Sequence, residues 1–147
     1  MPASNQDIAA SSDPGACCRD AESGLFTLSH FNSVLSQELA RLDRWERPLS
    51  LVILETIDLN PESWPVFGRL LLDSLRRIDL AARIGSSAVA VILPDAETPW
   101  ARRWLCGFAA ELGRQPLFSN LALRYGQALA RPWTTAFRPE ELVALAM

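Results

Sequence analysis

The sequence predicts a single α+β domain, in which helices pack on a mixed β-sheet that has one central β-hairpin. Helical patterns alternate with short apolar runs rich in β-branched residues, and two of these runs are separated only by residues 85–87. A composition of 49% hydrophobic and 21% charged residues is typical of a soluble globular domain. We expect residues 1–22 to be a disordered N-terminal tail and residues 23–147 to form the domain.

The first helix is predicted over residues 29–47, where apolar side chains recur every three or four positions. Its expected core face consists of Phe31, Val34, Leu35, Leu39, Leu42 and Trp45. Residues 49–54 form a short apolar run, which predicts a central strand buried on both faces. A second helix is predicted over residues 63–79, with Ile78 on its buried side.

Residues 80–84 and 88–93 are predicted to be the two strands of the hairpin, with Gly85 available for a positive φ. A third helix is expected to have Thr98 as its N-cap and to end near Gly113. The expected core face of this helix is Ala101, Trp104, Leu105, Phe108 and Leu112.

A last strand is predicted over residues 121–130, and a final short helix over residues 139–145. The element order is therefore α-β-α-β-β-α-β-α. Strands separated by helices, with one hairpin between them, predict the ferredoxin-like split βαβ arrangement.

Charge and cysteine content exclude several classes of function. A net charge of -3 argues against nucleic acid as a partner, because nucleic acid selects basic patches. No apolar run approaches the length needed for membrane insertion, and residues 1–7 do not resemble a signal peptide. Three cysteines, Cys17, Cys18 and Cys106, make no disulfide framework and fit a cytoplasmic protein.

The run from Arg76 to Pro94 resembles the signature of the GGDEF (diguanylate cyclase) family, R-x-x-D-x-x-x-R-x-G-G-D-E-F followed by an apolar strand. Residues 85–89, Gly-Ser-Ser-Ala-Val, stand where that family has Gly-Gly-Asp/Glu-Glu-Phe. Four further stretches resemble family motifs in the same order, at residues 20–25, 48–55, 123–128 and 139–142. The resemblance implies a nucleotidyl-cyclase-like fold and a bacterial signalling function.

The departures from the family pattern predict that this domain is degenerate and is not an enzyme. Two-metal nucleotidyl transfer needs carboxylates that hold Mg²⁺. The first metal-binding position is Glu55, the second is Ile57, and the acidic pair of the signature turn is replaced by Ser87 and Ala88. We therefore predict no catalytic residue, no metal site and no cofactor. A residual enzyme that uses Glu55 and Asp58 is the least favoured interpretation.

Two functions remain open. The first is a receptor for cyclic di-GMP, because the family's product-binding Arg-x-x-Asp pair is retained as Arg76 and Asp79. Placed three apart on a last helical turn, the two side chains would share a face, with Arg102 and Arg103 of the next helix assisting. A simple surface ion pair is the structural alternative.

The second function is a docking or dimerisation platform without a nucleotide ligand. Its partner would be a protein of a signalling or secretion system, or a second copy of the chain in a homodimer. Among the five tryptophans, Trp64 and Trp100 lie near predicted helix starts. Exposure of either ring would support this alternative, because aromatic side chains often anchor interfaces.

Overall fold

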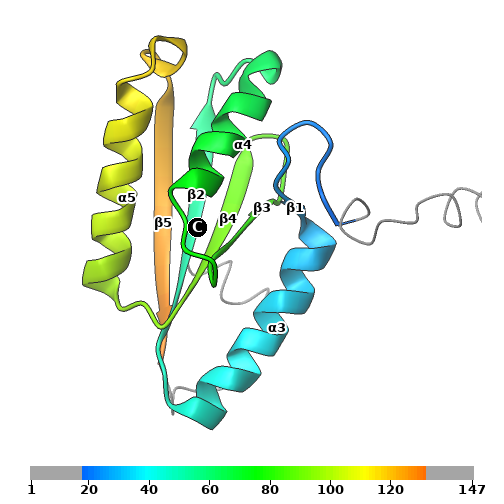
Figure 1. Ribbon diagram of the computed structural model, residues 1–147, viewed down its shortest axis with the longest axis vertical. Coiled ribbons are helices and arrows are strands. Elements are labelled where there is room, and N and C mark those ends of the chain that lie inside the picture. Colours follow the sequence, from blue (N-terminus) through cyan, green and yellow to red (C-terminus); the bar gives the residue numbers. More distant parts are fainter. Residues whose placement is uncertain (1–17, 132–147) are drawn as a thin grey trace, which may run out of the picture.

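The computed structural model describes residues 18–131, which form a five-stranded sheet with packed helices (Figure 1). The strands lie in the order β1-β3-β4-β2-β5. Their bounds are Phe26–Thr27 for β1, Leu49–Ile57 for β2, Leu80–Arg83 for β3, Ala88–Pro94 for β4 and Ala122–Ala130 for β5. β1 pairs with β3 in parallel, whereas β3–β4, β4–β2 and β2–β5 are antiparallel. The predicted α+β class with a mixed sheet is confirmed.

β2 is the central strand that the apolar run predicted, and it extends three residues beyond that run to Ile57. It lies between β4 and β5 and pairs with both along most of its length. Because side chains alternate along a strand, β2 supplies two cores. Leu51 and Ile53 belong to the core on one face of the sheet, and Val52 and Leu54 to the core on the other.

The helices are α3 (Leu28–Trp45), α4 (Trp64–Asp73) and α5 (Thr98–Gly113), with single 3₁₀ turns η1 (Pro61–Ser63) and η2 (Pro116–Phe118). α3 packs Phe31 and Leu35 against one face of the sheet. α4 and α5 share the other face, where the ring of Phe67 lies 5.8 Å from that of Phe108. Figure 1 shows α5 alongside β5 and α4 in front of β2 and β4.

The second helix is shorter than predicted, because α4 ends six residues before Asp79. The Ser74 hydroxyl donates to the carbonyl of Leu71 at 2.6 Å, and a non-helical connection then leads to β3. The Asp79 carboxylate accepts from the backbone N–H of Arg76, which offers this amide an alternative to a helical bond. Ile78, expected on the buried side of the helix, is consequently 53% exposed.

The hairpin between β3 and β4 is confirmed, with Ser86 and Ser87 at its tip. Gly85, which was available for a positive φ, does not adopt one, so this conformational freedom is not used. The five residues predicted for the core face of α5 are all buried, although its N-cap is Glu97 rather than Thr98. The predicted helix over residues 139–145 lies outside the described residues.

The expected tail, residues 1–22, lies mostly outside the described part of the chain. Its last five residues are described, and two of them, Asp20 and Glu22, form ion pairs with Arg83 of β3. Packing onto the sheet therefore begins N-terminal to the expected boundary. Within residues 18–131, no helix is long and apolar enough to cross a membrane.

Candidate functional site

The turn between α4 and β3 brings together Arg76 and Asp79, the first two residues predicted for the site. The Arg76 guanidinium donates to Asp79 through Nη2 at 2.8 Å and through Nε at 3.1 and 3.2 Å. The backbone N–H of Arg76 donates to the same carboxylate at 2.8 Å, and the Asp79 N–H donates back to the Arg76 carbonyl at 3.1 Å. The two residues therefore close the turn on each other, and they do so after α4 rather than on its last turn.

The guanidinium also ties this turn to two other elements. Arg76 Nη2 donates to the carbonyl oxygen of Pro94 at 2.8 Å, at the end of β4. Its Cζ lies 4.1 Å from the ring centroid of Trp100, in the first turn of α5, as in a cation–π contact. The Arg76 side chain is still 35% exposed, whereas that of Asp79 is 0% exposed. Only the arginine of the pair therefore offers a ligand any surface.

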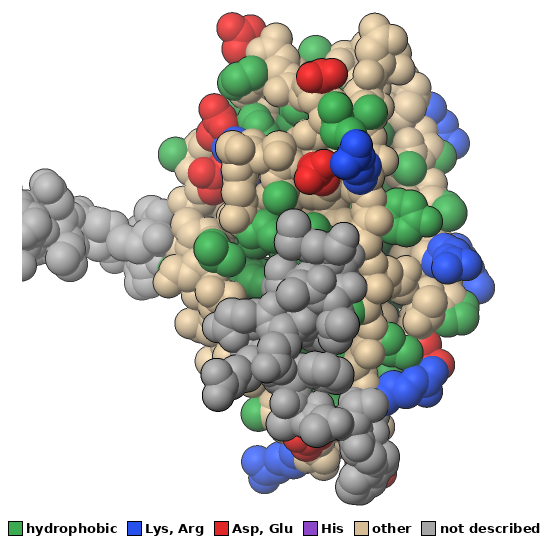
Figure 2. Space-filling model, turned by 180° about the vertical axis from the view of Figure 1, so that it is seen from behind, with side chains coloured by type: hydrophobic (Ala, Val, Ile, Leu, Met, Phe, Trp, Pro, Cys, Tyr) green, Lys and Arg blue, Asp and Glu red, His purple; other side chains and the backbone are tan. Residues whose placement is uncertain are grey.

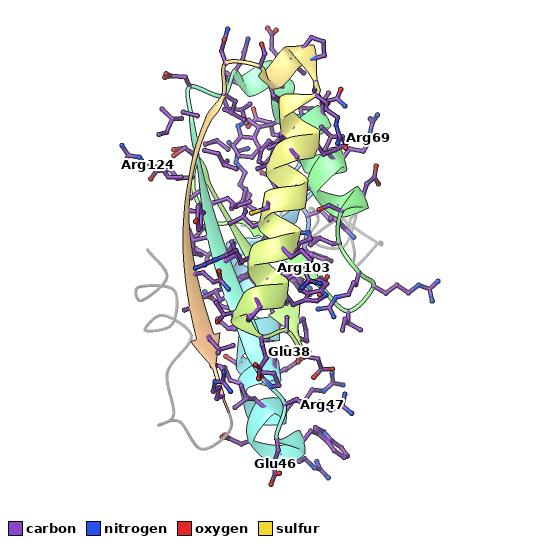
Figure 3. All side chains as sticks on the ribbon, turned by 90° about the vertical axis from the view of Figure 1, so that its left-hand side faces the viewer. Glu38, Glu46, Arg47, Arg69, Arg103 and Arg124 are labelled. Atoms are coloured by element: carbon purple, nitrogen blue, oxygen red, sulfur yellow. The ribbon has the colours of Figure 1, made fainter. Side chains whose placement is uncertain are left out.

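Arg102 and Arg103, the other two predicted site residues, are exposed on α5. A separation of three residues places Arg103 on the same side of the helix as Trp100, whereas Arg102 is on nearly the opposite side. Figure 3 shows Arg103 on the outer side of α5, about halfway along the molecule. Helical spacing thus places Arg103, but not Arg102, on the Trp100 side of α5.

The hairpin tip carries a second arginine cluster, which the sequence interpretation missed. Arg83 Nε donates to the carbonyl of Gly85 at 3.2 Å, and Nη2 donates to that of Ser86 at 2.9 Å. Its Nη1 donates to Asp20 at 3.2 Å and to Glu22, and the guanidinium lies 4.0 Å from the centre of a Trp64 ring. The tip is therefore held to the N-terminal segment by a cation that is largely buried.

Asp20 is fixed by this cluster. Burial raises the pKa of Asp20, but hydrogen bonds from the Ser23 hydroxyl and N–H and the pairing with Arg83 outweigh it, so the pKa lies below its ordinary value. The only sequence signal for the cluster was an arginine two residues before Gly85. Nothing in the local pattern indicated that Asp20 and Glu22 would contact it.

The residues at and beside the positions that would hold metal in a cyclase make other contacts in this chain. Glu55 faces Arg124 of β5, with 3.7 Å between Oε1 and Nη1. Asp58 follows the end of β2 with a left-handed φ of 63°. The hydroxyl and N–H of Thr56 both donate to the Ser87 carbonyl, at 3.1 and 2.7 Å. Among residues 18–131, no group of three His, Cys, Asp or Glu side chains is placed to hold a metal ion.

Of the described tryptophans, Trp45 departs from the sequence interpretation. Trp64 is 2% exposed beneath Arg83, and Trp100 is half-buried beneath Arg76. Trp45, expected on the core face of the first helix, is 62% exposed because α3 runs past the edge of its core. The exposed indole of the described chain is thus at the end of α3.

No protein-family model matches this sequence, and no curated protein matches it. Solved structures do resemble it. The GGDEF domain of FimX from Pseudomonas aeruginosa superposes with a TM-score of 0.74 at 16% identity, over 88% of each chain. The GGDEF domain of DgcB from Caulobacter crescentus, solved in complex with c-di-GMP, gives 0.77 at 14% identity, over 88% of this chain and 83% of that one.

The diguanylate cyclase SiaD from Pseudomonas aeruginosa, solved with its activator SiaC, gives a TM-score of 0.78 at 18% identity. The match covers 97% of this chain but only 58% of SiaD, so the present chain corresponds to part of that protein. At these identities the likeness shows the fold alone. The chain has the nucleotidyl-cyclase-like fold of GGDEF domains, as the resemblance in sequence implied.

Proposed function

We propose that this chain is a GGDEF-like signalling domain that does not synthesise cyclic di-GMP and instead binds it at the turn after α4. The observation that carries the proposal is the fixed orientation and partial exposure of the Arg76 guanidinium. Its guanidinium is oriented by a buried carboxylate, stacked on Trp100 and still partly exposed. An arginine held in this way loses little conformational entropy when it binds a phosphate or a guanine edge.

The proposal assigns a role to three of the four predicted residues and gives none to Arg102. Arg76 contacts the ligand, and Arg103 adds a second positive charge from the same side of α5. Both oxygens of Asp79 accept from Arg76, so Asp79 positions the guanidinium rather than contacting guanine. Trp100 offers aromatic surface beside the phosphate-binding group. The complex of DgcB with c-di-GMP supports the choice of ligand, since that domain has the same fold.

The absence of synthesis rests on the metal-binding positions. Glu55 is engaged with Arg124, and neutral Ser87 and Ala88 occupy the acidic positions of the signature turn. The proposed site therefore recognises a product that another protein makes. Incubation with GTP and Mg²⁺ or Mn²⁺ should yield no dinucleotide above a control without protein, and detection of product would contradict this part of the proposal.

Calorimetric titration with cyclic di-GMP, GMP and GTP tests the receptor function. We expect saturable binding of cyclic di-GMP alone. Arg76→Lys retains a charge beside Asp79 but loses the planar guanidinium that Asp79 and the Pro94 carbonyl hold in place, so affinity should fall by about tenfold. Arg103→Ala should also weaken binding, whereas Arg102→Ala and Arg77→Ala serve as matched controls and should change it less than about twofold.

Two results would contradict the receptor function. Equal affinity in the wild type and in folded Arg76→Lys would place the ligand elsewhere on the domain. No binding by the wild type would favour the alternative, a docking or dimerisation platform without a nucleotide. Exposure of Trp64 or Trp100 would have supported this alternative, but Trp64 is buried and the exposed indole is that of Trp45.

A further inference from the structure

The Arg76 guanidinium uses most of its hydrogen-bonding capacity inside the protein. A guanidinium carries five N–H groups, one on Nε and two on each of Nη1 and Nη2. The Nε–H donates to the Asp79 carboxylate, at 3.2 and 3.1 Å from its two oxygens. Nη2 donates both to Asp79 and to the Pro94 carbonyl, each at 2.8 Å, so its two N–H groups are used. The two N–H groups of Nη1 remain for a ligand.

Nη1 is also the nitrogen of Arg76 that a ligand can reach. Within the described chain it makes no hydrogen bond, and no buried side-chain nitrogen or oxygen lacks one, so Nη1 is not buried. The Arg76 side chain is 35% exposed even though the guanidinium lies 4.1 Å from the centre of the Trp100 ring. A ligand at this turn therefore meets two N–H groups on a single nitrogen.

This arrangement removes the fork by which arginine reads guanine. Two parallel N–H groups of an arginine normally bond O6 and N7 of the base. A guanidinium has two edges that carry such a pair, Nε with Nη2 and Nη1 with Nη2. Both edges require Nη2, which is engaged by Asp79 and Pro94. A single N–H can still donate to N7, but adenine and guanine share that acceptor. It can equally donate to a phosphate oxygen, whose charge strengthens the bond.

The Asp79 carboxylate is not available to guanine either. Guanine carries hydrogens on N1 and N2, and a carboxylate could accept from both. The Asp79 side chain is 0% exposed, and both of its oxygens accept from Arg76. A base could reach Asp79 only if Arg76 left its contacts with Asp79, Pro94 and Trp100. Asp79 therefore orients the arginine, and guanine reading would need another carboxylate.

Three further carboxylates belong to the elements that flank the site. Asp95 and Glu97, between β4 and α5, pair with Arg47 and Arg131 at 3.0 and 3.3 Å. Asp73, the last residue of α4, is exposed and forms no ion pair with another described residue. Asp73 is therefore the carboxylate to vary as a control for guanine reading.

We propose that this site binds a cyclic dinucleotide through its phosphates and the faces of its purines. The adenine analogue, cyclic di-AMP, then binds as well as cyclic di-GMP. The inference rests on the proposed function, since it places the ligand at Arg76. Nη1 of Arg76 contacts one phosphate, and Arg103, on the Trp100 side of α5, contacts the other. Seen from behind, positive side chains lie along the edge of the molecule that α5 and β5 form (Figure 2).

Stacking completes the recognition without distinguishing the two purines. The Trp100 ring and the guanidinium plane of Arg76 offer flat surfaces to a base. Such stacking tolerates any base, because every base has a π-face. GMP and GTP carry a single base and lack the second stacking contact, so the site still selects a cyclic dinucleotide.

Calorimetric titration of the full chain with cyclic di-GMP and cyclic di-AMP, at one salt concentration, tests the inference. We expect the two dissociation constants to agree within about fivefold, because a bidentate contact to guanine would separate them by more. Arg76→Lys should weaken both ligands by the same factor. Arg77→Ala is the matched control on the same turn, and it should leave both affinities unchanged within about twofold.

Asp79→Asn distinguishes orientation of the arginine from reading of the base. The amide keeps the size of the side chain but loses the charge that holds the guanidinium, so both affinities should fall and their ratio should stay constant. Asp73→Asn should leave both affinities unchanged within about twofold. Circular dichroism checks that each variant is folded, and the comparison of the two ligands in the wild type needs no variant.

Several results would overturn the inference. Selectivity above about fivefold for either ligand in the wild type would do so, and a preference for cyclic di-GMP would leave the receptor function standing. If that preference disappeared in Asp73→Asn, guanine reading would belong to Asp73. A loss confined to cyclic di-GMP in Asp79→Asn would assign it to Asp79. No binding of either ligand, or equal affinities that Arg76→Lys leaves unchanged, would overturn the receptor function as well.

Discussion

Removal of Arg76 and Asp79, singly and together, should show that the two side chains are strongly coupled. The Asp79 side chain is 0% exposed, and both of its oxygens accept from Arg76. Arg76→Ala leaves this carboxylate buried with only a backbone N–H as a donor. Stranding a buried charge costs about 3–5 kcal/mol, and the remaining N–H bond places this variant toward the lower end of that range.

The reverse substitution should cost less. In Asp79→Ala the guanidinium keeps its bond to the Pro94 carbonyl and its contact with Trp100, and its exposed part remains hydrated. The loss is then that of the charge-assisted hydrogen bonds, about 1.5–3 kcal/mol. The double variant strands no charge, so its cost should be smaller than the sum of the two single costs. We expect a coupling free energy of about 2 kcal/mol.

Urea unfolding, followed by tryptophan fluorescence and circular dichroism, measures the four free energies of unfolding in this cycle. The dependence of the free energy on urea concentration should be the same in all four proteins, so that the midpoints report stability. A coupling below about 0.5 kcal/mol would refute the reasoning, because that value is typical of an exposed ion pair. It would support the surface-pair interpretation that the sequence left open.

Three other positions give predictions of defined sign. A Cβ at Gly68 would overlap the carbonyl oxygen of Ser23, so Gly68→Ala should destabilise the domain by about 1–3 kcal/mol. A Cβ at Gly107 would meet open space on α5, so Gly107→Ala should stabilise the domain by up to about 1 kcal/mol. Thermal unfolding of the two variants and the wild type measures both effects. The lowered pKa of Asp20 means that its contribution is present above the unfolded pKa of about 4 and is lost as pH falls through the folded pKa. The stability difference between the wild type and Asp20→Asn should therefore be constant above about pH 5 and shrink below about pH 4; a difference that grows in acid would contradict this account.

Local patterns predicted most of the fold, because hydrophobic periodicity reports which side of an element meets the core. The α5 face from Ala101 to Leu112 and the central strand β2 were predicted in this way and are confirmed. Periodicity does not report where the sheet ends. It therefore placed Ile78 and Trp45 in the core, although Ile78 lies in the turn after α4 and Trp45 at the end of α3, and both are exposed.

The same distinction between local pattern and tertiary contacts applies to the candidate site. The sequence by itself determined which groups are available: the Arg76–Asp79 pair, the neutral hairpin tip, and the element order that places them around one sheet. Only the tertiary structure decided that Asp79 is buried, that Arg76 stacks on Trp100, and that Arg83 holds the hairpin tip. These outcomes depend on contacts between residues far apart in the chain, whose energies are set by burial and mutual orientation. No local pattern encodes either quantity.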